Sequence, residues 1–551
     1  MRSFYLTPKL FACMKGYNGQ QLVKDLIAGI IVAIIALPLS IALALASGVE
    51  PAAGVYTAIA AGFVVSLFGG SRVQIAGPTA AFATTVAGIV AVKGMDGLFI
   101  ATVMAGIFLI LMGVFKLGSL IKFIPGTITV GFTAGIAVTI LVGQIKDFFG
   151  LQYASGVKPI ETFEKIEANI HAISTFSWQA LLVGAVCLLI LIVYPKIEKR
   201  IPPSLIAVVV GILMVKLIPG LGDHVFTIGE LYTIPAGLPK ISLSGMDLSF
   251  DNIASLVPDA FTIAILAAIE SLLSCVVADS MVNSKHNSNA ELVAQGLGNI
   301  ASVLFGGIPA TGAIARTAAN AKNGGRTPVA GMVHAVVLLL VLLFLMPLAG
   351  LIPMPAIAAI LFMVAYNMSE WKKFVRILKR APKSDSFVMV LTFVLTVVFD
   401  LVVAIVVGLV LAAMLFMKRM SSEANVVGWE YPENDADSID LRQVPKHVRV
   451  YEISGPMFFG SAERILDIQF KDYTKCLVLR MRGVPSLDES AISAMESLYK
   501  KCQKKNVTLI FSHVNAQPLE ALKKAGLYDV VGGEYFCPHI DDALALAETI
   551  A

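Results

Sequence analysis

Two short segments that contain glycine and proline have residue types suited to binding an anion through their backbone. They read AGPTAAFATT at 76–85 and GIPATGAIARTAAN at 307–320. A helix that begins inside a membrane exposes unpaired N–H groups and the positive end of its dipole, and two such ends that meet bind an anion. The alternative is close helix packing through small residues. The residues expected to contact the ligand are Thr79, Ala80, Gly312 and Ala313.

Arg316 belongs to the second of these segments. An arginine at membrane depth costs about 3 kcal/mol even on the mildest insertion scale, so it should face a cavity or a carboxylate. We interpret it as an electrostatic contribution to anion binding. A structural ion pair and a position at the cytoplasmic end of the helix are the alternatives.

Glu270 is the single acidic residue between Ala260 and Val277, in a long apolar segment. An apolar environment favours the neutral form of a carboxyl group, which can then carry a proton. Ser274 follows one helical turn later on the same face. We predict that this pair couples transport to protons, with a salt bridge to Arg316 as the alternative. His334 is interpreted as a hydrogen-bonded core histidine rather than a proton relay.

The elements that must position these residues are membrane helices. Of the 551 residues, 57% are hydrophobic and only 15% are charged, well below the charge content of a soluble domain. The net charge of +4 is too small to indicate nucleic-acid binding. Apolar runs predict fourteen spans near 25–47, 54–69, 78–92, 97–115, 125–143, 178–195, 203–218, 258–279, 290–305, 310–321, 328–349, 354–367, 385–399 and 401–417.

Charge and repetition set the expected topology. With both termini inside, the even-numbered connections hold more than twice as many Lys and Arg as the odd-numbered ones. The string LFGG occurs at 67–70 and at 304–307, just before each of the two Pro-containing segments. Seven spans separate the copies, so they run in opposite directions, as in an inverted repeat. We predict two inverted repeats of seven spans in the cell (inner) membrane.

After Glu423 the sequence becomes that of a soluble α/β domain. Strand-like runs such as 447–453, 476–481 and 507–512 alternate with helix-like runs. The six cysteines form no C-x-x-C pair, and we find no metal, cofactor or enzyme motif. The predicted division is a cytoplasmic N-terminus over 1–24, a membrane domain over 25–419, a linker over 420–440 and an α/β domain over 441–551.

Several motifs together resemble the SulP family of anion transporters with a C-terminal STAS domain. The membrane motifs are DLIAGIIVAIIALPLSIALALASGVEPAAGVYTAIAAG at 25–62, GPTAAFA at 77–83, AIESLLSCVVADSM at 268–281 and ARTAANAKNGG at 315–325. GPMFF at 455–459 and VPSLDESA at 484–491 are similar to a STAS domain. The resemblance implies the fourteen-helix fold with core and gate domains, elevator-type movement and a homodimer.

The same resemblance implies an anion site from Ala313 through Ile314 and Ala315 to Arg316, opposite Thr79 and Ala80. It adds two positions of the first span, where sulfate permeases and prestin carry Gln and an aromatic residue and this chain has leucine. The bacterial members that carry C4-dicarboxylates such as succinate and fumarate are more similar at these positions. Sodium-bicarbonate members carry Asp at the position of Glu270, so the resemblance favours proton over sodium coupling. The two first-span positions are Leu39 and Leu43.

The sequence leaves several alternatives open. The substrate is expected to be an inorganic anion (sulfate or bicarbonate) or a C4-dicarboxylate. A nucleobase transporter of the same fold and a non-transporting sensor that signals through STAS are the rival functions; an enzyme has little support. Ser490 matches a phosphorylated serine of related anti-sigma-factor antagonists, although an N-cap role for Asp488 or Ser490 is the preferred interpretation. A cytoplasmic partner of the STAS domain is a further possibility; nucleic acid is not.

Overall fold

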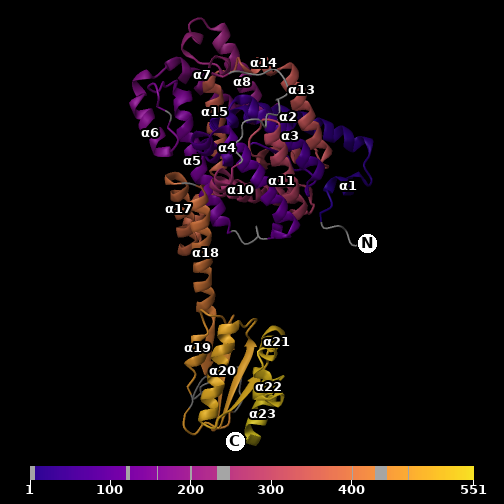
Figure 1. Cartoon of the computed structure of the whole chain (residues 1–551), viewed down its shortest axis with the longest axis vertical. Helices are drawn as coiled ribbons and strands as arrows, with labels where there is room; N and C mark the ends of the chain where they lie inside the picture. Colours follow the sequence, from indigo (N-terminus) through magenta and orange to yellow (C-terminus); the bar gives the residue numbers. More distant parts are fainter. Residues whose placement is uncertain are drawn as a thin grey trace. The chain divides into compact units, whose positions relative to one another are not determined.

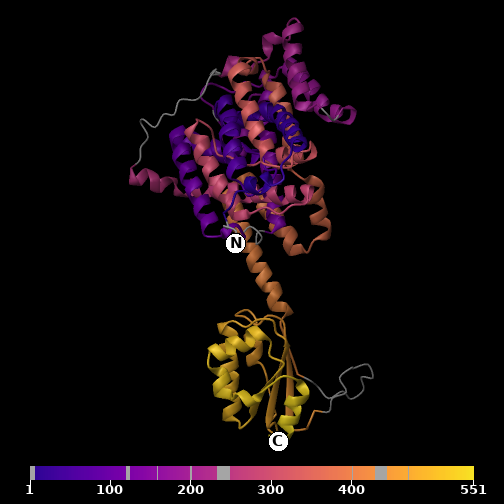
Figure 2. The same ribbon diagram turned by 90° about the vertical axis from the view of Figure 1, so that its right-hand side faces the viewer.

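The computed structural model describes residues 6–119, 125–157, 159–198, 201–232, 249–399, 401–428, 444–469 and 471–550. The chain divides into two units, Met1–Leu409 and Val410–Ala551, and each is described by itself. The first unit is a bundle of helices in both views (Figures 1 and 2), and the second contains a sheet. The helix that contains the division, α18 (Leu401–Glu423), belongs to both units.

Every predicted span falls on a helix. Seven described helices are long and apolar enough to cross a membrane, and shorter apolar helices lie among them. One long helix, α4, holds the third and fourth predicted spans, which meet at Gly94 with a φ of 69° that favours glycine. The helices are α2 (Gly19–Ala46), α3 (Pro51–Phe68), α4 (Ala80–Val114), α5 (Gly126–Phe149), α7 (Trp178–Ile197), α8 (Pro203–Leu217), α10 (Phe250–Val282), α11 (Ser288–Leu304), α12 (Ile314–Lys322), α13 (Val329–Phe344), α15 (Met354–Met368), α17 (Lys383–Val398) and α18. Asp400, expected to separate the last two, lies outside the described residues.

Short helices that the apolar pattern did not predict lie before the first span, in the connections and, at 346–349, in the last residues of the eleventh predicted span. They are too short or too polar to register in a search for long apolar runs. The basic cluster after the twelfth span forms one of them, with a charged face and an apolar face. These helices are α1 (Lys9–Met14), α6 (Thr162–His171), α9 (Ile228–Leu231), α14 (Met346–Ala349) and α16 (Trp371–Arg380).

The membrane helices pack as two groups. In the first, α11 packs against α3 and α4, α10 packs against α4 and α12, and α13 packs against α2 and α3. In the second, α5 packs against α15 and α17, and α7 packs against α8 and α15. The groups also meet each other, for example where α2 lies against α8 and α15. The Pro-containing segments both belong to the first group.

The second unit is a five-stranded sheet covered on both faces. Its order is β3 (Asn425–Gly428), β4 (Val448–Ser454), β5 (Cys476–Gly483), β6 (Thr508–Ser512) and β7 (Phe536–Cys537). Only the β3–β4 pair is antiparallel. Successive side chains of a strand point to opposite faces, so each strand contributes to two apolar layers.

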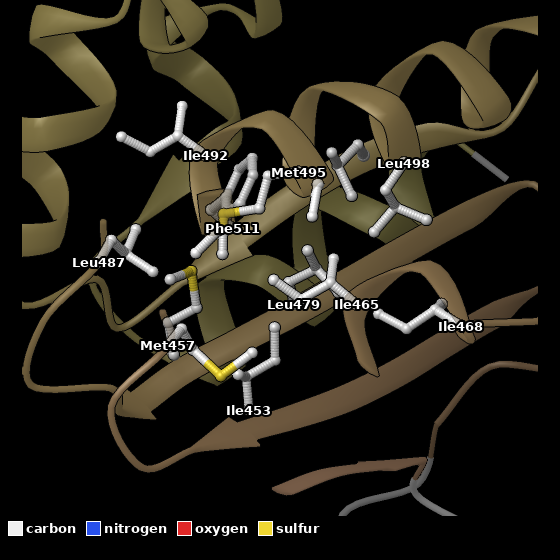
Figure 3. Packing of buried hydrophobic residues seen from close by; sticks show 14 of the residues in the cluster. Ile453, Met457, Ile465, Ile468, Leu479, Leu487, Ile492, Met495, Leu498 and Phe511 are labelled. Carbon is white, nitrogen blue, oxygen red and sulfur yellow. The ribbon is translucent and has the colours of Figure 1, made fainter. Parts of the chain in front are cut away.

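Helices complete these two layers. On one face, α19 (Glu463–Leu466), α20 (Glu489–Lys504), α21 (Ala516–Lys524) and α22 (Leu527–Val531) cover the sheet; α23 (Ile540–Ile550) covers the other. Figure 3 shows the first layer, where Met495 and Leu498 of α20 lie over Leu479 and Phe511 of the strands. The predicted α/β unit is therefore present with its own core.

The segment expected to be a linker contains regular structure. Residues 420–423 continue α18, and β3 then pairs with β4 as an edge strand of the sheet. The rest of the expected linker, from residue 429 to 440, lies outside the described residues. Strand β3 was missed because its four residues are too few to show a period of two.

Candidate functional site

The two Pro-containing segments meet through a pair of very short strands. β1 (Ala76–Gly77) and β2 (Thr311–Gly312) pair antiparallel, and the N–H of Ala313 donates to Ile75 O at 2.8 Å. A Cβ on Gly77 would lie 2.5 Å from Arg316 Nη1, and one on Gly312 would overlap Gln74 Nε2. A side chain at either glycine would therefore displace the end of the Arg316 or the Gln74 side chain. The antiparallel pairing brings the segments together from opposite directions, as an inverted repeat demands.

A helix begins directly after each strand, without a side-chain cap. Thr79 is the N-cap of α4 and Ala313 that of α12, and neither side chain accepts a hydrogen bond from its helix. Asn18, Ser249 and Asn287 cap α2, α10 and α11. Side-chain caps are also absent from α3, α5, α8, α13, α15 and α17, so what distinguishes α4 and α12 is that their starts meet at the β1–β2 pair. The first N–H groups of α4 and α12 are thus left for another acceptor, at the positive ends of two helix dipoles.

The predicted contact residues differ in exposure. Ala80 and Ala313 are buried, whereas Ile314 and Ala315, in the first turn of α12, are exposed. The hydroxyl Oγ1 of Thr79 is buried and has no hydrogen-bond partner among the described residues. The first turn of α12 is therefore not covered by described parts of the protein, and a hydroxyl without a described partner lies at the start of α4.

The β1–β2 pair and the starts of α4 and α12 that follow it are together called the crossing. Arg316 is buried beside it. Its side chain is 1% exposed, and Nη2 donates to Pro78 O at 3.2 Å, which links α12 to the start of α4. Nε and Nη1 have no acceptor in the part of the chain that the structure describes. The ion pair with Glu270 that was considered as an alternative is not formed between these two described residues. The guanidinium therefore keeps two nitrogen donors that can form charge-assisted hydrogen bonds to an anion.

Glu270 lies on the face of α10 that contacts the crossing. On that face Ser271 Oγ bonds to Thr311 Oγ1 at 2.8 Å and accepts from Gly312 N at 3.0 Å. Ser274 Oγ donates to Thr317 Oγ1 at 3.3 Å. Glu270 itself is 7% exposed and has no hydrogen bond to a described residue. Ser274 thus holds α12 in place, whereas Glu270 is held by no hydrogen bond or ion pair from the described residues.

The two leucines expected from the first span contribute no polar atom. Leu39 is half-buried and Leu43 is buried in α2, which packs against both α4 and α12. The helix continues through Pro38. Their helix therefore borders the crossing, and any contact they make with a ligand is apolar.

His334 is a core residue. The imidazole is fully buried in α13, but neither ring nitrogen has a hydrogen-bond partner among the described residues. A Cβ built on Gly62 of α3 would lie 3.6 Å from His334 Nδ1 and 3.3 Å from Ala76 O of β1. The expectation of a core histidine agrees with this burial, and the hydrogen bond expected of the ring is not formed with any residue that the structure describes.

Sequence reasoning missed a polar stripe that holds the crossing in place. On α11, Glu291 accepts from the N–H groups of Gly70 (2.9 Å) and Ser71 (3.2 Å), before β1. Two turns later Asn299 pairs with both backbone groups of Ala310, at 2.8 Å each, before β2. Gln295 lies between them and donates to Glu291. The signal was available as three polar residues spaced by four in an apolar span.

In the second unit, Asp488 is the N-cap of α20. Its Oδ1 accepts from Ala491 N at 2.9 Å, and its Oδ2 accepts from Phe459 N at 2.9 Å. This is the role preferred from the sequence. Ser490 is exposed in the first turn of α20. Among the described residues no cluster of His, Cys, Asp and Glu could hold a metal ion.

Comparison with known proteins decides the family. The profile of the sulfate permease family matches residues 22–392, and that of the STAS domain matches residues 438–544. The chain belongs to the sulfate permease family. It is 42% identical over 96% of its length to "Putative sulfate transporter YvdB" of Bacillus subtilis (strain 168), covering 98% of that protein. The family prediction is confirmed, and the function is transport rather than catalysis.

Two further relatives extend the comparison. The chain is 32% identical to the bicarbonate transporter BicA of Picosynechococcus sp. (strain ATCC 27264 / PCC 7002 / PR-6), over 92% of this chain and 91% of that protein. The structure of the murine Slc26a9 anion transporter in the inward-facing state superposes with a TM-score of 0.87 at 18% identity, covering 99% of this chain and 94% of that one. This likeness shows the fold. The predicted helical transporter fold with a C-terminal STAS domain is confirmed.

Proposed function

We propose that the chain is a secondary active anion transporter that binds its substrate between the N-termini of α4 and α12. The observation that carries this proposal is the pair of uncapped helix starts beside Arg316, whose Nε and Nη1 have no partner among the described residues. An anion there accepts from backbone N–H groups around Thr79–Ala80 and Ala313–Ala315, and the guanidinium adds a charge-assisted bond.

The proposed substrate is a small inorganic anion, sulfate or bicarbonate. The names of the relatives support this, as does the shortage of side-chain donors beyond Thr79 and Arg316. A C4-dicarboxylate such as succinate or fumarate is the second candidate, because apolar Leu39 and Leu43 on α2 suit the methylene or vinylene carbons of such a substrate.

Uptake is proposed to be symport with protons through Glu270. A carboxylate without a hydrogen bond, beside a bound anion, repels that anion when it is charged and not when it is protonated. Proton and anion therefore favour each other's binding, which is a coupling free energy shared by the two ligands. Ser274 supports the arrangement from the same helix by holding Thr317 of α12.

Movement is proposed to follow an elevator mechanism. The group of helices that carries the crossing (α2, α3, α4, α10, α11, α12 and α13) moves against the second group as a body. The stripe on α11 and the bonds of Ser271 keep the crossing intact during such a movement. The proposed setting is a homodimer in the cell inner membrane with both termini and the STAS unit in the cytoplasm. A protein partner of the STAS unit and phosphorylation of Ser490 belong to the same proposal.

The test is uptake by purified protein in proteoliposomes, with sulfate, bicarbonate, succinate, fumarate and aspartate as substrates. Each is measured with and without an inward proton gradient. We expect one inorganic anion to accumulate, and accumulation to require the gradient. Uptake of none of these anions by well-folded protein would contradict transport and favour a sensor. Accumulation that persists without a proton gradient would contradict symport.

A further inference from the structure

A basic pocket lies where α1, the start of α2 and the connections before β1 and after α12 come together. It has a volume of about 260 Å³. Four cations line it and no acid does, in a chain whose overall charge is almost balanced. These cations are Lys15, Lys24, Arg72 and Arg326. The pocket is separate from the crossing and no step of the proposed transport uses it.

A buried carboxylate, Asp25, lies behind the pocket wall and forms no ion pair with the described cations that line the pocket. Asp25 is fully buried and accepts four hydrogen bonds. Tyr17 Oη (3.1 Å) and Thr327 Oγ1 (2.6 Å) donate to its Oδ2, and Gln21 Nε2 (3.0 Å) and Arg326 N (2.9 Å) donate to Oδ1. Burial, followed by the charge of Asp25, raises the pKa of Tyr17 to about 12, so this phenol keeps its proton. The carboxylate thus fixes the pocket wall.

Two guanidinium groups are held in place while keeping free donors. Arg326 Nη1 donates to Ala321 O and Gly325 O, each at 2.7 Å, and Arg72 Nε donates to Cys13 Sγ at 3.4 Å. The remaining terminal nitrogens of Arg72, and Nη2 of Arg326, make no hydrogen bond to a described residue. Oriented guanidinium groups of this kind suit the oxygen atoms of a phosphate.

The two lysines complete the basic wall from the end of α1 and the first turns of α2. Both Lys15 and Lys24 are exposed and make no hydrogen bond or ion pair with a described residue. The N-terminus of α2, at Gly19, lies between them in the sequence and adds the positive end of a helix dipole. An anion in the pocket is therefore attracted by four side chains and by a helix.

An exposed apolar stripe leads away from the pocket along α2. The side chains in this stripe are between 38% and 54% exposed, and they repeat at the spacing of one helix face. In a membrane helix such a face contacts acyl chains. The stripe consists of Leu22, Val23, Leu26, Ile27 and Ile30.

We propose that this pocket binds the phosphate headgroup of an anionic membrane lipid whose acyl chains lie along the exposed face of α2. The ligand chemistry is a phosphate mono- or diester, and the adjoining apolar stripe selects a lipid over a soluble phosphate. Arg72 lies just before Gln74 and β1, and Arg326 follows α12. A bound lipid therefore bridges the connections that lead to both halves of the crossing.

The experiment measures lipid binding by the full chain in delipidated neutral detergent. Dioctanoyl phosphatidylglycerol, dioctanoyl phosphatidylcholine and inorganic phosphate are titrated separately, and thermal unfolding and native mass spectrometry report binding. The variant Lys15→Gln/Lys24→Gln removes two charges whose side chains support no structure. The control Lys372→Gln/Lys379→Gln removes two charges from α16.

We expect phosphatidylglycerol to bind and to stabilise the wild type, and phosphatidylcholine not to. The pocket variant should bind phosphatidylglycerol about 30-fold more weakly, since each cation near a surface contributes about fivefold, and the control should bind like wild type. Equal binding of the two lipids, or an equal loss in both variants, would overturn the proposal. Inorganic phosphate that binds as tightly as phosphatidylglycerol would overturn the assignment to a lipid.

Discussion

The two halves of the crossing share a backbone plan and differ in chemistry. Both have a two-residue strand that ends in a glycine, followed by a helix without a side-chain cap. The first half continues into α4, with 35 residues and no charge near its start. The second continues into α12, with nine residues, an exposed first turn and buried Arg316. The repeated backbone arrangement therefore provides two helix starts, and only the second half adds a charged side chain.

This difference predicts unequal sensitivity to mutation. If an anion lies between the halves, both helix starts contribute backbone donors, but the half with α12 also carries the charge and the accessible turn. Changes in the second half should then affect transport more than equivalent changes in the first. The following predictions test this asymmetry, beginning with the largest effect.

Ala313→Trp should abolish uptake. Ala313 is the N-cap of α12, and an indole there fills the space in front of the free N–H groups. Substrate uptake in proteoliposomes measures the loss, and thermal unfolding checks that the fold survives. Val336→Trp, on an exposed position of α13, is the matched control and should transport normally. Wild-type affinity in Ala313→Trp would place the anion elsewhere.

Arg316→Gln should weaken anion binding by about 10- to 100-fold, the usual value of a hydrogen bond to a charged group. Two of its three donor nitrogens have no partner among the described residues, so the substrate-free protein should unfold at the same temperature or higher. Arg316→Lys, which keeps the charge and loses the planar fork, should be intermediate. A marked loss of stability with unchanged affinity would show that the arginine is structural.

The sequence predicted the helices of the crossing better than their supports. The Pro-containing segments, the buried arginine and the buried glutamate stood out because proline, glycine and charge are rare in apolar spans. The pairing of Asn299 with Ala310 could not be derived in this way. Polar residues at a spacing of four only indicate a helix face, and what that face contacts depends on which helices pack together.

The two buried acids near the crossing give a sharper contrast. Glu291 accepts three hydrogen bonds from its surroundings, whereas Glu270 has none to a described residue. Glu291→Gln should therefore lower stability, by about 1.5–3 kcal/mol for a lost bond to a charged group, and leave proton dependence unchanged. Glu270→Gln mimics the protonated acid and should keep stability and anion binding.

Proton-driven accumulation separates these outcomes. Glu270→Gln cannot release a proton, so it should exchange anions and fail to concentrate them when only an inward pH gradient drives uptake. The measurement is the ratio of internal to external substrate at steady state, with Glu291→Gln as the control that retains accumulation. If Glu270→Gln still concentrates substrate, the coupling residue is another one, and buried His334 becomes the next candidate.

The smallest effect is expected from removal of the soluble unit. Deletion of residues 430–551 leaves the helices that carry the crossing, whose packing partners all lie in Met1–Leu409. The sheet has its own apolar core on each of its two faces. Substrate affinity of the truncated protein should therefore stay within about twofold of the full chain, while dimer stability, trafficking or regulation changes more.

Isothermal titration of the truncated and full-length proteins in the same detergent measures the dissociation constants. A large shift in a truncated protein with a normal unfolding transition would mean that the soluble unit acts on the crossing, and the asymmetry between the two halves would no longer account for binding.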